Sequence, residues 1–321
     1  MDEYVKEDHD QALEYMNSAL AAIPKDTKVS TNPSDVYFYR GNIYLFNADY
    51  KAALADYTHA LNLKPQYAIA YNNRGIVHKA IGEYESALAD FTLALGLDSE
   101  LDEAYNNRGT TYCDMGKYES ALVDFTRALE IDPEDAEVYY NRGSAYKSMS
   151  KYELALADYA RAVELNPNYA DAYYNRGNLY LALGQYDLAR ADYTCVLDLD
   201  SEAVDACYNR GIAYLAMGEY KAALGDFTRT LELNPKVAEA YNNRGNVYLA
   251  MGDYKSALAD YTCALEINPE FADARFNRGV VYEGLGQVEK AIADFERFLE
   301  LSTDPELRAQ AEQYLRELRG E

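Results

Sequence analysis

Small, apolar and aromatic residues recur at steps of three and four along most of the chain, which is the spacing of a single helix face. Residues 84–95 carry one such stripe, formed by Tyr84, Ala87, Leu88, Phe91, Ala94 and Leu95. Residues 71–79 carry a shorter stripe with the same spacing, and Gly82 lies between the two. Glycine readily takes the left-handed conformation that ends a helix. The pattern therefore predicts two antiparallel helices joined by a tight turn.

This two-helix pattern repeats with a period of 34 residues. The dipeptide Arg-Gly marks each copy, at Arg40-Gly41, Arg74-Gly75, Arg108-Gly109, Arg142-Gly143, Arg176-Gly177, Arg210-Gly211, Arg244-Gly245 and Arg278-Gly279. Self-similarity at a fixed period is the signature of a solenoid built from stacked units. The sequence predicts eight repeats over residues 34–305, with starts at residues 34, 68, 102, 136, 170, 204, 238 and 272.

The two ends of the array differ from its interior, as the ends of solenoids must. Residues 11–24 align with a second helix alone, so residues 1–33 are predicted to form a half-repeat or cap helix followed by a loop. At the other end, Asp304 and Pro305 are typical of a helix start. An apolar stripe follows them, so residues 306–321 are predicted to form a capping helix. Either the chain begins with a cap, or it is a piece of a longer array.

Each repeat also carries a small residue and an aromatic residue where its two helices should cross. The small residue of the second helix is alanine, at Ala53, Ala87, Ala121, Ala155, Ala189, Ala223, Ala257 and Ala291. An aromatic residue follows four positions later, at Tyr57, Phe91, Phe125, Tyr159, Tyr193, Phe227, Tyr261 and Phe295. Together with the glycine of the first helix, this pattern resembles the tetratricopeptide repeat. The resemblance implies an all-α, right-handed superhelical solenoid of antiparallel helix pairs, whose first helices line a concave groove that binds other proteins.

The chain is strongly acidic, with 30 Lys and Arg against 54 Asp and Glu, which gives a net charge of −24. An acidic surface repels phosphate groups, so nucleic acids and anionic membranes are disfavoured as partners. Two interpretations stay open: the acidity selects basic partners, or it keeps a long exposed array in solution. Neither a secretory signal nor a run of about eighteen apolar residues is present, so we expect no membrane span and a cytoplasmic location.

Candidate chemistry is sparse. The cysteines lie at no metal-ligand spacing from one another or from a histidine: Cys113, Cys195, Cys207 and Cys263. The 33 tyrosines are interpreted as core and inter-repeat packing and not as a cofactor box. Each repeat is nearly a copy of its neighbour, whereas an active site needs a unique constellation. We therefore expect no enzyme activity, no metal and no cofactor, and no evident partner for His59 or His78.

An arginine precedes the first-helix glycine in every repeat, and an aspartate follows that glycine by fifteen residues. An arginine and a carboxylate can form two parallel hydrogen bonds. One interpretation of the arginines is an anion-binding track along the groove. The other is a ladder of ion pairs that fixes helix register, which the equal regularity of the acids favours. The predicted pairs include Arg74–Asp90, Arg108–Asp124, Arg142–Asp158, Arg176–Asp192 and Arg210–Asp226.

The groove implied by the resemblance carries a row of asparagines two residues before the glycines, at Asn73, Asn107, Asn141, Asn175, Asn209, Asn243 and Asn277. In one glycosyltransferase of the family a similar row binds the backbone of an extended peptide, a task that suits an amide because it both donates and accepts hydrogen bonds. The alternative is that asparagine is merely common at this position. One residue earlier the middle repeats place Tyr140, Tyr174 and Tyr208, where we expect a side-chain pocket.

A row of acids lies six residues before the glycines, and in the same middle repeats it comprises Glu137, Asp171 and Asp205. These acids can select Lys or Arg side chains on a ligand. They also suit the first turn of a helix, where the macrodipole favours negative charge. Co-chaperone members of the family grip a carboxylate with basic groove residues, and acids at this place argue against that specialisation.

The sequence therefore predicts a non-catalytic scaffold or adaptor that binds an extended, Lys/Arg-rich protein or peptide segment in its groove. Two alternatives stay open. In the first, the chain is the substrate-recruiting or regulatory arm of a larger enzyme or complex, which the half-repeat at its start favours. In the second, it is a structural scaffold that self-associates into homo-oligomers.

Overall fold

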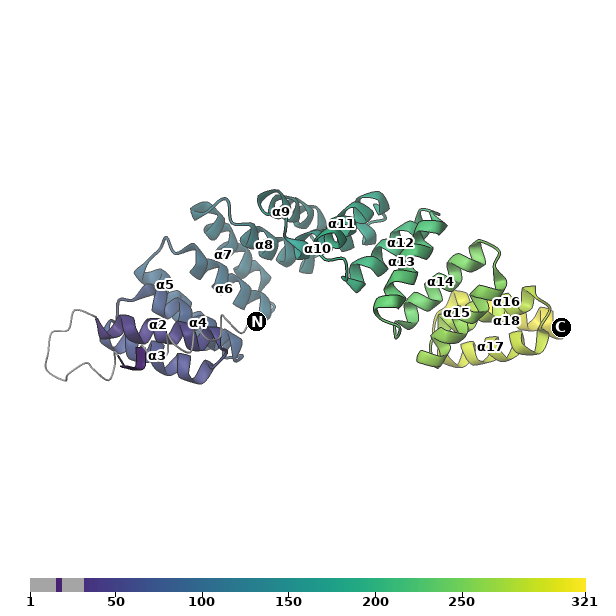
Figure 1. The fold of residues 1–321 in the computed structure, drawn as a ribbon, viewed down its shortest axis with the longest axis horizontal. Helices are drawn as coiled ribbons and strands as arrows, with labels where there is room; N and C mark the ends of the chain where they lie inside the picture. The colour runs from purple at the N-terminus through teal and green to yellow at the C-terminus, as the bar shows by residue number, and fades with distance from the viewer. Residues whose placement is uncertain (1–15, 19–31) are drawn as a thin grey trace. The chain divides into compact units, whose positions relative to one another are not determined.

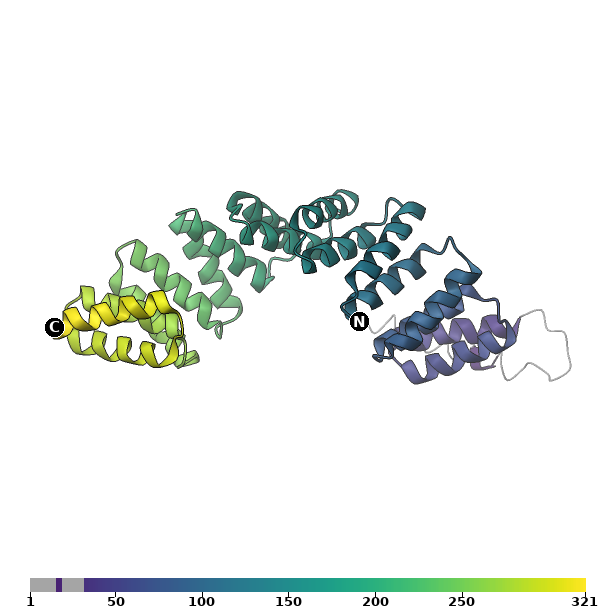
Figure 2. The same cartoon turned by 180° about the vertical axis from the view of Figure 1, so that it is seen from behind.

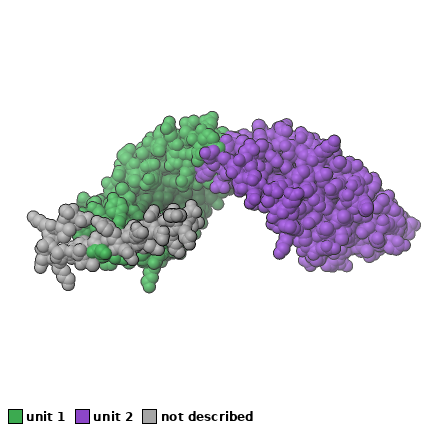
Figure 3. Space-filling model, viewed as in Figure 1, with its two compact units in different colours: residues 1–167 green, residues 168–321 purple. Residues whose placement is uncertain are grey.

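A computed structural model describes residues 16–18 and 32–321. Every regular element within those ranges is an α-helix, as Figures 1 and 2 show from opposite sides. The chain divides into two compact bodies, residues 1–167 and residues 168–321, which we call the N-terminal body and the C-terminal body (Figure 3). Each described repeat is a pair of helices, so the predicted all-α class and helix-pair architecture are confirmed.

The N-terminal body holds the helices of repeats 1 to 4: α2 (Pro33–Phe46), α3 (Tyr50–Leu63), α4 (Ala68–Ala80), α5 (Tyr84–Leu97), α6 (Asp102–Asp114), α7 (Tyr118–Ile131), α8 (Ala136–Ser148) and α9 (Tyr152–Leu165). The C-terminal body holds those of repeats 5 to 8 and one helix beyond them: α10 (Ala170–Ala182), α11 (Tyr186–Leu199), α12 (Val204–Ala216), α13 (Tyr220–Leu233), α14 (Ala238–Ala250), α15 (Tyr254–Ile267), α16 (Ala272–Gly284), α17 (Val288–Leu301) and α18 (Pro305–Arg319). The predicted half-repeat over residues 11–24 lies almost wholly outside the described residues.

The glycine of each first helix allows the second helix to approach closely. In repeat 2, a methyl group added to Gly75 would lie 2.7 Å from Cε1 of Phe91, which is closer than packed carbon atoms can come. Phe91 and the neighbouring Ala87 are both fully buried. The small residue and the aromatic ring therefore form one interlocking contact, and the same contact recurs in every repeat.

A left-handed residue ends each turn between the paired helices. Gly82 has φ of 81°, and glycines hold the equivalent place in most repeats. Repeats 1 and 4 instead place Ala48 and Ser150 there, each with φ of 57°. A side chain at positive φ is strained, so these two turns are held by the helices that flank them.

Successive helix pairs stack within each body, because the second helix of one repeat packs on the first helix of the next. Between repeats 2 and 3, Ala94 and Leu95 of α5 meet Ala104 of α6 in a buried cluster, and Tyr71 and Tyr105 pack against it. Several predicted core tyrosines therefore serve as inter-repeat packing.

Helix α18 covers the exposed side of the last repeat. The Asp304 side chain caps its start by accepting hydrogen bonds from the backbone N–H groups of Glu306 and Leu307. Gly320 ends it in the left-handed conformation. Ala311 of α18 is fully buried in a cluster with Phe295 of α17, as expected of a helix that shields an end.

Candidate functional site

The arginine before each glycine and the aspartate sixteen residues after it meet in every repeat. The guanidinium donates from Nε and Nη2 to the two carboxylate oxygens, at 2.6 to 2.8 Å. The aspartate side chains are 4 to 10 % exposed and the arginines 16 to 21 %. The structure thus brings together each arginine and aspartate that the sequence paired, and most of each guanidinium is turned away from solvent.

The same arginines also tie neighbouring repeats together. Nη1 of Arg108 donates to Oγ1 of Thr92, in the second helix of the preceding repeat, at 3.2 Å. Four further arginines make the matching bond to a threonine, at 3.2 to 3.3 Å: Arg74, Arg210, Arg244 and Arg278. The hydrogen bonds to Asp124 raise the pKa of Arg108, so its charge is fixed. These contacts favour the structural interpretation of the row over an anion-binding track.

The asparagine row joins neighbouring repeats in the N-terminal body. Nδ2 of Asn107 donates to Oδ1 of Asn72, and Nδ2 of Asn141 donates to Oδ1 of Asn106, both at 3.0 Å. Nδ2 of Asn73 donates to the preceding repeat as well, to Oδ1 of Asn42 at 2.9 Å. We call this contact the asparagine clasp, and the surface of the first helices that carries the row the asparagine face.

The C-terminal body uses tyrosine hydroxyls as acceptors in two of its clasps. Nδ2 of Asn243 donates to the hydroxyl of Tyr208 at 3.0 Å, and Nδ2 of Asn209 to that of Tyr174 at 3.3 Å. Asn209 also donates to Asn178 Oδ1 at 3.0 Å. Two acceptors serve Asn277, at 3.0 and 3.1 Å, namely Asn242 and Asn246. Asn175 donates within its own helix, to the carbonyl of Asp171 at 3.1 Å.

The clasp fixes the orientation of an amide through its nitrogen, which leaves the amide oxygen for another hydrogen bond. Within the described residues, no protein donor reaches Oδ1 of Asn107, Asn141, Asn209 or Asn277. All four side chains are half-buried, so these oxygens are held in place at the surface. The hydrogen-bonding capacity of these asparagines is thus divided: the amide nitrogen donates to the scaffold, and the amide oxygen is left to accept from a ligand.

The tyrosines predicted to form a pocket are half-buried and pack on the core. The rings of Tyr140, Tyr174 and Tyr208 lie 5.9 to 6.1 Å from the second-helix aromatic of the same repeat. Tyr174 lines a pocket of the C-terminal body, and Tyr208 contributes its hydroxyl to a clasp. These tyrosines therefore support the asparagine face as well as bordering it.

A set of polar residues that the sequence analysis did not single out completes the face. The second-helix tyrosines place their hydroxyls on the residue after the first-helix glycine, in the pairs Tyr57–Asn42, Tyr159–Ser144, Tyr193–Asn178 and Tyr261–Asn246, at 2.7 to 3.1 Å. Repeats with phenylalanine instead have Ile76, Thr110, Ile212 or Val280 there. This covariation is visible in the sequence and could have identified the pairs. Burial raises the pKa of Tyr159 to about 12, so its hydroxyl stays protonated.

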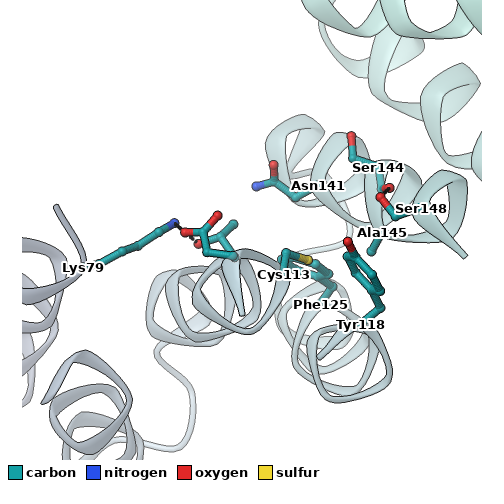
Figure 4. A pocket seen from close by; sticks show the side chains of 10 residues that line it. Lys79, Cys113, Tyr118, Phe125, Asn141, Ser144, Ala145 and Ser148 are labelled. Atoms are coloured by element: carbon teal, nitrogen blue, oxygen red, sulfur yellow. Dashed lines mark hydrogen bonds and ion pairs between the residues drawn. The ribbon is translucent and has the colours of Figure 1, made fainter. Parts of the chain in front are cut away.

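A pocket of about 370 Å³ opens on the asparagine face of the N-terminal body (Figure 4). It spans three successive first helices, α4, α6 and α8, with further walls from α7. Its polar lining consists of Lys79, Thr110, Cys113, Asp114, Tyr118, Asn141, Ser144 and Ser148. One predicted asparagine, Asn141, thus belongs to a pocket whose other members the sequence analysis missed.

A pocket of about 310 Å³ on the C-terminal body has a different lining. Three carboxylates surround it, from Asp171, Asp200 and Asp205, and Tyr174 supplies an aromatic wall. Val196, Val204 and three alanines complete the surface. The acids Asp171 and Asp205 also lie in the first turns of α10 and α12, as does Glu137 in α8. Asp171 and Asp205 therefore fit both interpretations of the acidic row, selection of basic ligand groups and favourable charge at a helix start.

His59 and His78 both have neighbours, contrary to the expectation from the sequence. Nδ1 of His78 lies 2.7 Å from Oε2 of Glu83, and the ring of His59 stacks on Tyr37 at 5.0 Å. Across residues 16–18 and 32–321, no three His, Cys, Asp or Glu side chains gather in a way that could hold a metal ion. In the same part of the chain, no helix has the length and apolar character to cross a membrane.

Family models for the tetratricopeptide repeat match most of the chain. One model described as "Tetratricopeptide repeat" matches residues 170–202, 204–237 and 238–271, and two more with that description match residues 40–102 and 261–293. A model described as "TPR repeat" matches residues 109–150 and 143–184. The comparison with curated proteins gives no match.

Solved structures point the same way. The crystal structure of YrrB, described as "a TPR protein with an unusual peptide-binding site", is 32 % identical, with a TM-score of 0.51 over 59 % of this chain and 97 % of YrrB. The C-terminal part of a TPR repeat-containing protein from Cytophaga hutchinsonii is 20 % identical, with a TM-score of 0.62 over 73 % of this chain and 97 % of that one. PilF of Pseudomonas aeruginosa is 19 % identical, with a TM-score of 0.54 over 69 % of this chain and 98 % of PilF, and like the previous match it shows the fold alone.

The helix pairs, the glycine–aromatic contacts and these matches lead to one conclusion. The chain belongs to the tetratricopeptide repeat family. Its fold is one that typically serves as a non-catalytic scaffold for protein–protein interaction.

Proposed function

We propose that the chain holds an extended polypeptide segment bearing Lys or Arg side chains along its asparagine face. The observation that carries this proposal is the set of oriented amide oxygens at Asn107, Asn141, Asn209 and Asn277. Each is an acceptor without a described protein donor, and a peptide backbone offers one N–H donor per residue. Because these acceptors read only the backbone, they favour an extended segment of relaxed sequence.

The pocket of the C-terminal body supports a basic segment. Asp171, Asp200 and Asp205 supply negative charge, and the face of Tyr174 can attract a cation. Val196 offers apolar surface for the aliphatic stem of a lysine or arginine side chain. The net charge of −24 adds long-range attraction for such a ligand.

The comparison with YrrB supports the same class of ligand. That protein is described as having a peptide-binding site, and it is similar to this chain over 97 % of its own length. The similarity supports peptide binding in general, whereas the preference for Lys or Arg rests on the acidic pocket of this chain.

The test uses random dodecapeptides displayed on phage, selected on the intact chain and then synthesised for affinity measurements. The variant Asn209→Ala with Asn277→Ala removes two amides whose oxygens have no described protein donor. Each lost hydrogen bond costs about 0.5–1.5 kcal/mol, so affinity should fall roughly 5- to 150-fold. Affinity of the wild type should also fall as salt rises, because exposed charges are screened.

The matched control, for Asn209, is Tyr174→Phe. It removes the acceptor hydroxyl of the Asn209 clasp but leaves the amide oxygen and the aromatic ring in place. We expect peptide affinity to stay within about threefold of wild type, since no ligand contact is lost. Equal losses in both variants, or peptides without Lys and Arg, would contradict the proposal.

A further inference from the structure

The pocket of the N-terminal body has walls of balanced charge. Nζ of Lys79 lies 3.4 Å from Oδ2 of Asp114 and donates a hydrogen bond to Oγ1 of Thr110 at 2.7 Å (Figure 4). The other lining residues are uncharged. A charged ligand group would therefore meet a like charge and find the opposite charge already paired.

The pocket also offers hydrogen-bond acceptors and donors side by side. On the acceptor side are Oδ1 of Asn141, whose nitrogen is held by Asn106, and Oγ of Ser148, whose proton goes to the carbonyl of Ser144. On the donor side, Lys79 keeps one N–H beyond its contacts with Thr110 and Asp114. The hydroxyl of Tyr118 has no partner among the described residues.

We propose that this pocket binds the primary carboxamide side chain of an asparagine or glutamine in the bound segment. The inference rests on the proposed function, since it concerns the same asparagine face. A carboxamide presents two N–H donors and one carbonyl acceptor on a neutral group, which matches the acceptors and donors of the pocket. Its N–H groups would donate to Asn141 and Ser148, and its carbonyl would accept from Lys79 or Tyr118.

Lysine, glutamate and leucine side chains fit this pocket less well. A lysine would lie against Lys79, and a glutamate would lie against Asp114. A leucine would cover the Lys79 and Asn141 groups without pairing them, and unpaired polar groups are costly to bury. The pocket at Asn141 and the pocket at Tyr174 therefore select different side chains.

The experiment selects phage-displayed random dodecapeptides on the intact chain and sorts the clones with two variants. Ser148→Phe fills the pocket from an exposed position at the end of α8. Ala182→Phe is the matched control, at the equivalent exposed position at the end of α10. Clones lost on Ser148→Phe but kept on Ala182→Phe should be enriched in Asn or Gln at one position.

Synthetic peptides then test the chemistry of the pocket. Replacing the enriched Gln by Leu or Glu should weaken binding to the wild type roughly tenfold, since two or more hydrogen bonds are lost. Lys79→Met leaves Asp114 unpaired and should make the Gln→Lys peptide the better ligand. Asp114→Asn leaves Lys79 unpaired and should favour the Gln→Glu peptide instead.

Several outcomes overturn the inference. Clones that depend on Ser148 but carry Lys, Glu or apolar residues at that position contradict the carboxamide, as does an unchanged ranking of the peptides on Lys79→Met. Clones that need the asparagine row and ignore Ser148→Phe refute the pocket while leaving the proposed function intact. Failure to select any clone that depends on the asparagine row overturns both.

Discussion

The N-terminal and C-terminal bodies share their internal contacts and differ in what they present to a ligand. Both contain the bidentate arginine–aspartate pair in each repeat and the contact between glycine and an aromatic ring. Their clasps differ, because the acceptors described in the N-terminal body are asparagine oxygens, whereas two of those in the C-terminal body are the hydroxyls of Tyr174 and Tyr208. Their pockets differ further, with balanced charge in one and three carboxylates in the other.

The repeats therefore share their structural contacts but not the side chains that they present to a ligand. The contacts that hold helices together recur every 34 residues with the same residue types. The residues of the asparagine face follow the same spacing but change in chemistry from repeat to repeat. An array built this way keeps one architecture while varying the side chains that meet a partner.

The largest effect should come from breaking the ladder, and it should be alike in both bodies. Arg108→Leu and Arg244→Leu each leave a buried aspartate without its counter-ion, which costs up to about 3–5 kcal/mol. Urea denaturation followed by circular dichroism measures the loss. Arg278→Leu should cost less, because Arg275 remains 3.7 Å from Asp294.

The control for the ladder is the double variant Arg108→Leu with Asp124→Leu, which removes both charges and should recover part of the lost stability. A loss below about 0.5 kcal/mol for Arg108→Leu, the size expected of a surface change, would mean that the pair is not a buried contact in solution.

The next largest effect is expected at Cys113, which lines the pocket of the N-terminal body. Burial and then the charge of Asp114 raise the pKa of Cys113 to about 11. At pH 8.5 its thiolate fraction should be roughly a hundredfold below that of a free cysteine, so iodoacetamide should label it about a hundredfold more slowly. The rate should rise tenfold per pH unit up to about 11, measured by peptide mapping with mass spectrometry.

Asp114→Asn serves as the control for Cys113, since it removes a negative charge that opposes the thiolate and should speed labelling. The raised pKa also fixes the sign of a stability effect. The folded state holds the thiol proton more tightly than the unfolded state, so stability should fall as pH rises from about 8.5 to 11. Labelling as fast as in a denatured sample would show that the thiol is not buried.

The smallest effect compares the clasps of the two bodies. Tyr208→Phe removes one acceptor hydroxyl and keeps the ring against Phe227, so it should cost about 0.5–1.5 kcal/mol. Asn72→Ala removes an acceptor that is 2 % exposed and leaves a gap, so it should cost more. Thermal and urea unfolding of both variants give the ranking, and the reverse order would mean that the tyrosine clasp is the stronger one.

Much of the fold follows from spacing alone. The glycine, alanine and aromatic positions predict the helix pairs, because the two helices of a pair contact each other within one repeat. Contacts over so short a separation leave a regular spacing in the sequence. The arginine–aspartate pairs were predictable for the same reason, since both partners lie in one repeat.

The clasps and most residues of the pockets were not predicted, because they depend on how one repeat packs on the next, although a side-chain pocket was expected near Tyr174. Asn141 meets Asn106 across 35 residues, and Asn73 meets Asn42 across 31, so no single spacing marks the contact. The pocket joins Lys79 to Ser148 through three first helices. Asparagine was predicted to offer a ligand both donors and an acceptor, whereas stacking commits at least one of its donors to the scaffold.

The clasps between repeats and the arginine–threonine bonds run in one direction along the chain. The asparagine and the arginine of a repeat donate backward, to an acceptor in the repeat before it. A repeat such as the third therefore carries one half of a contact, the donors, toward the repeat before it and the other half, an acceptor, toward the repeat after it. A gene duplication or deletion of 34 codons would rejoin matching halves, so the array can lengthen or shorten by whole repeats without inventing a new junction.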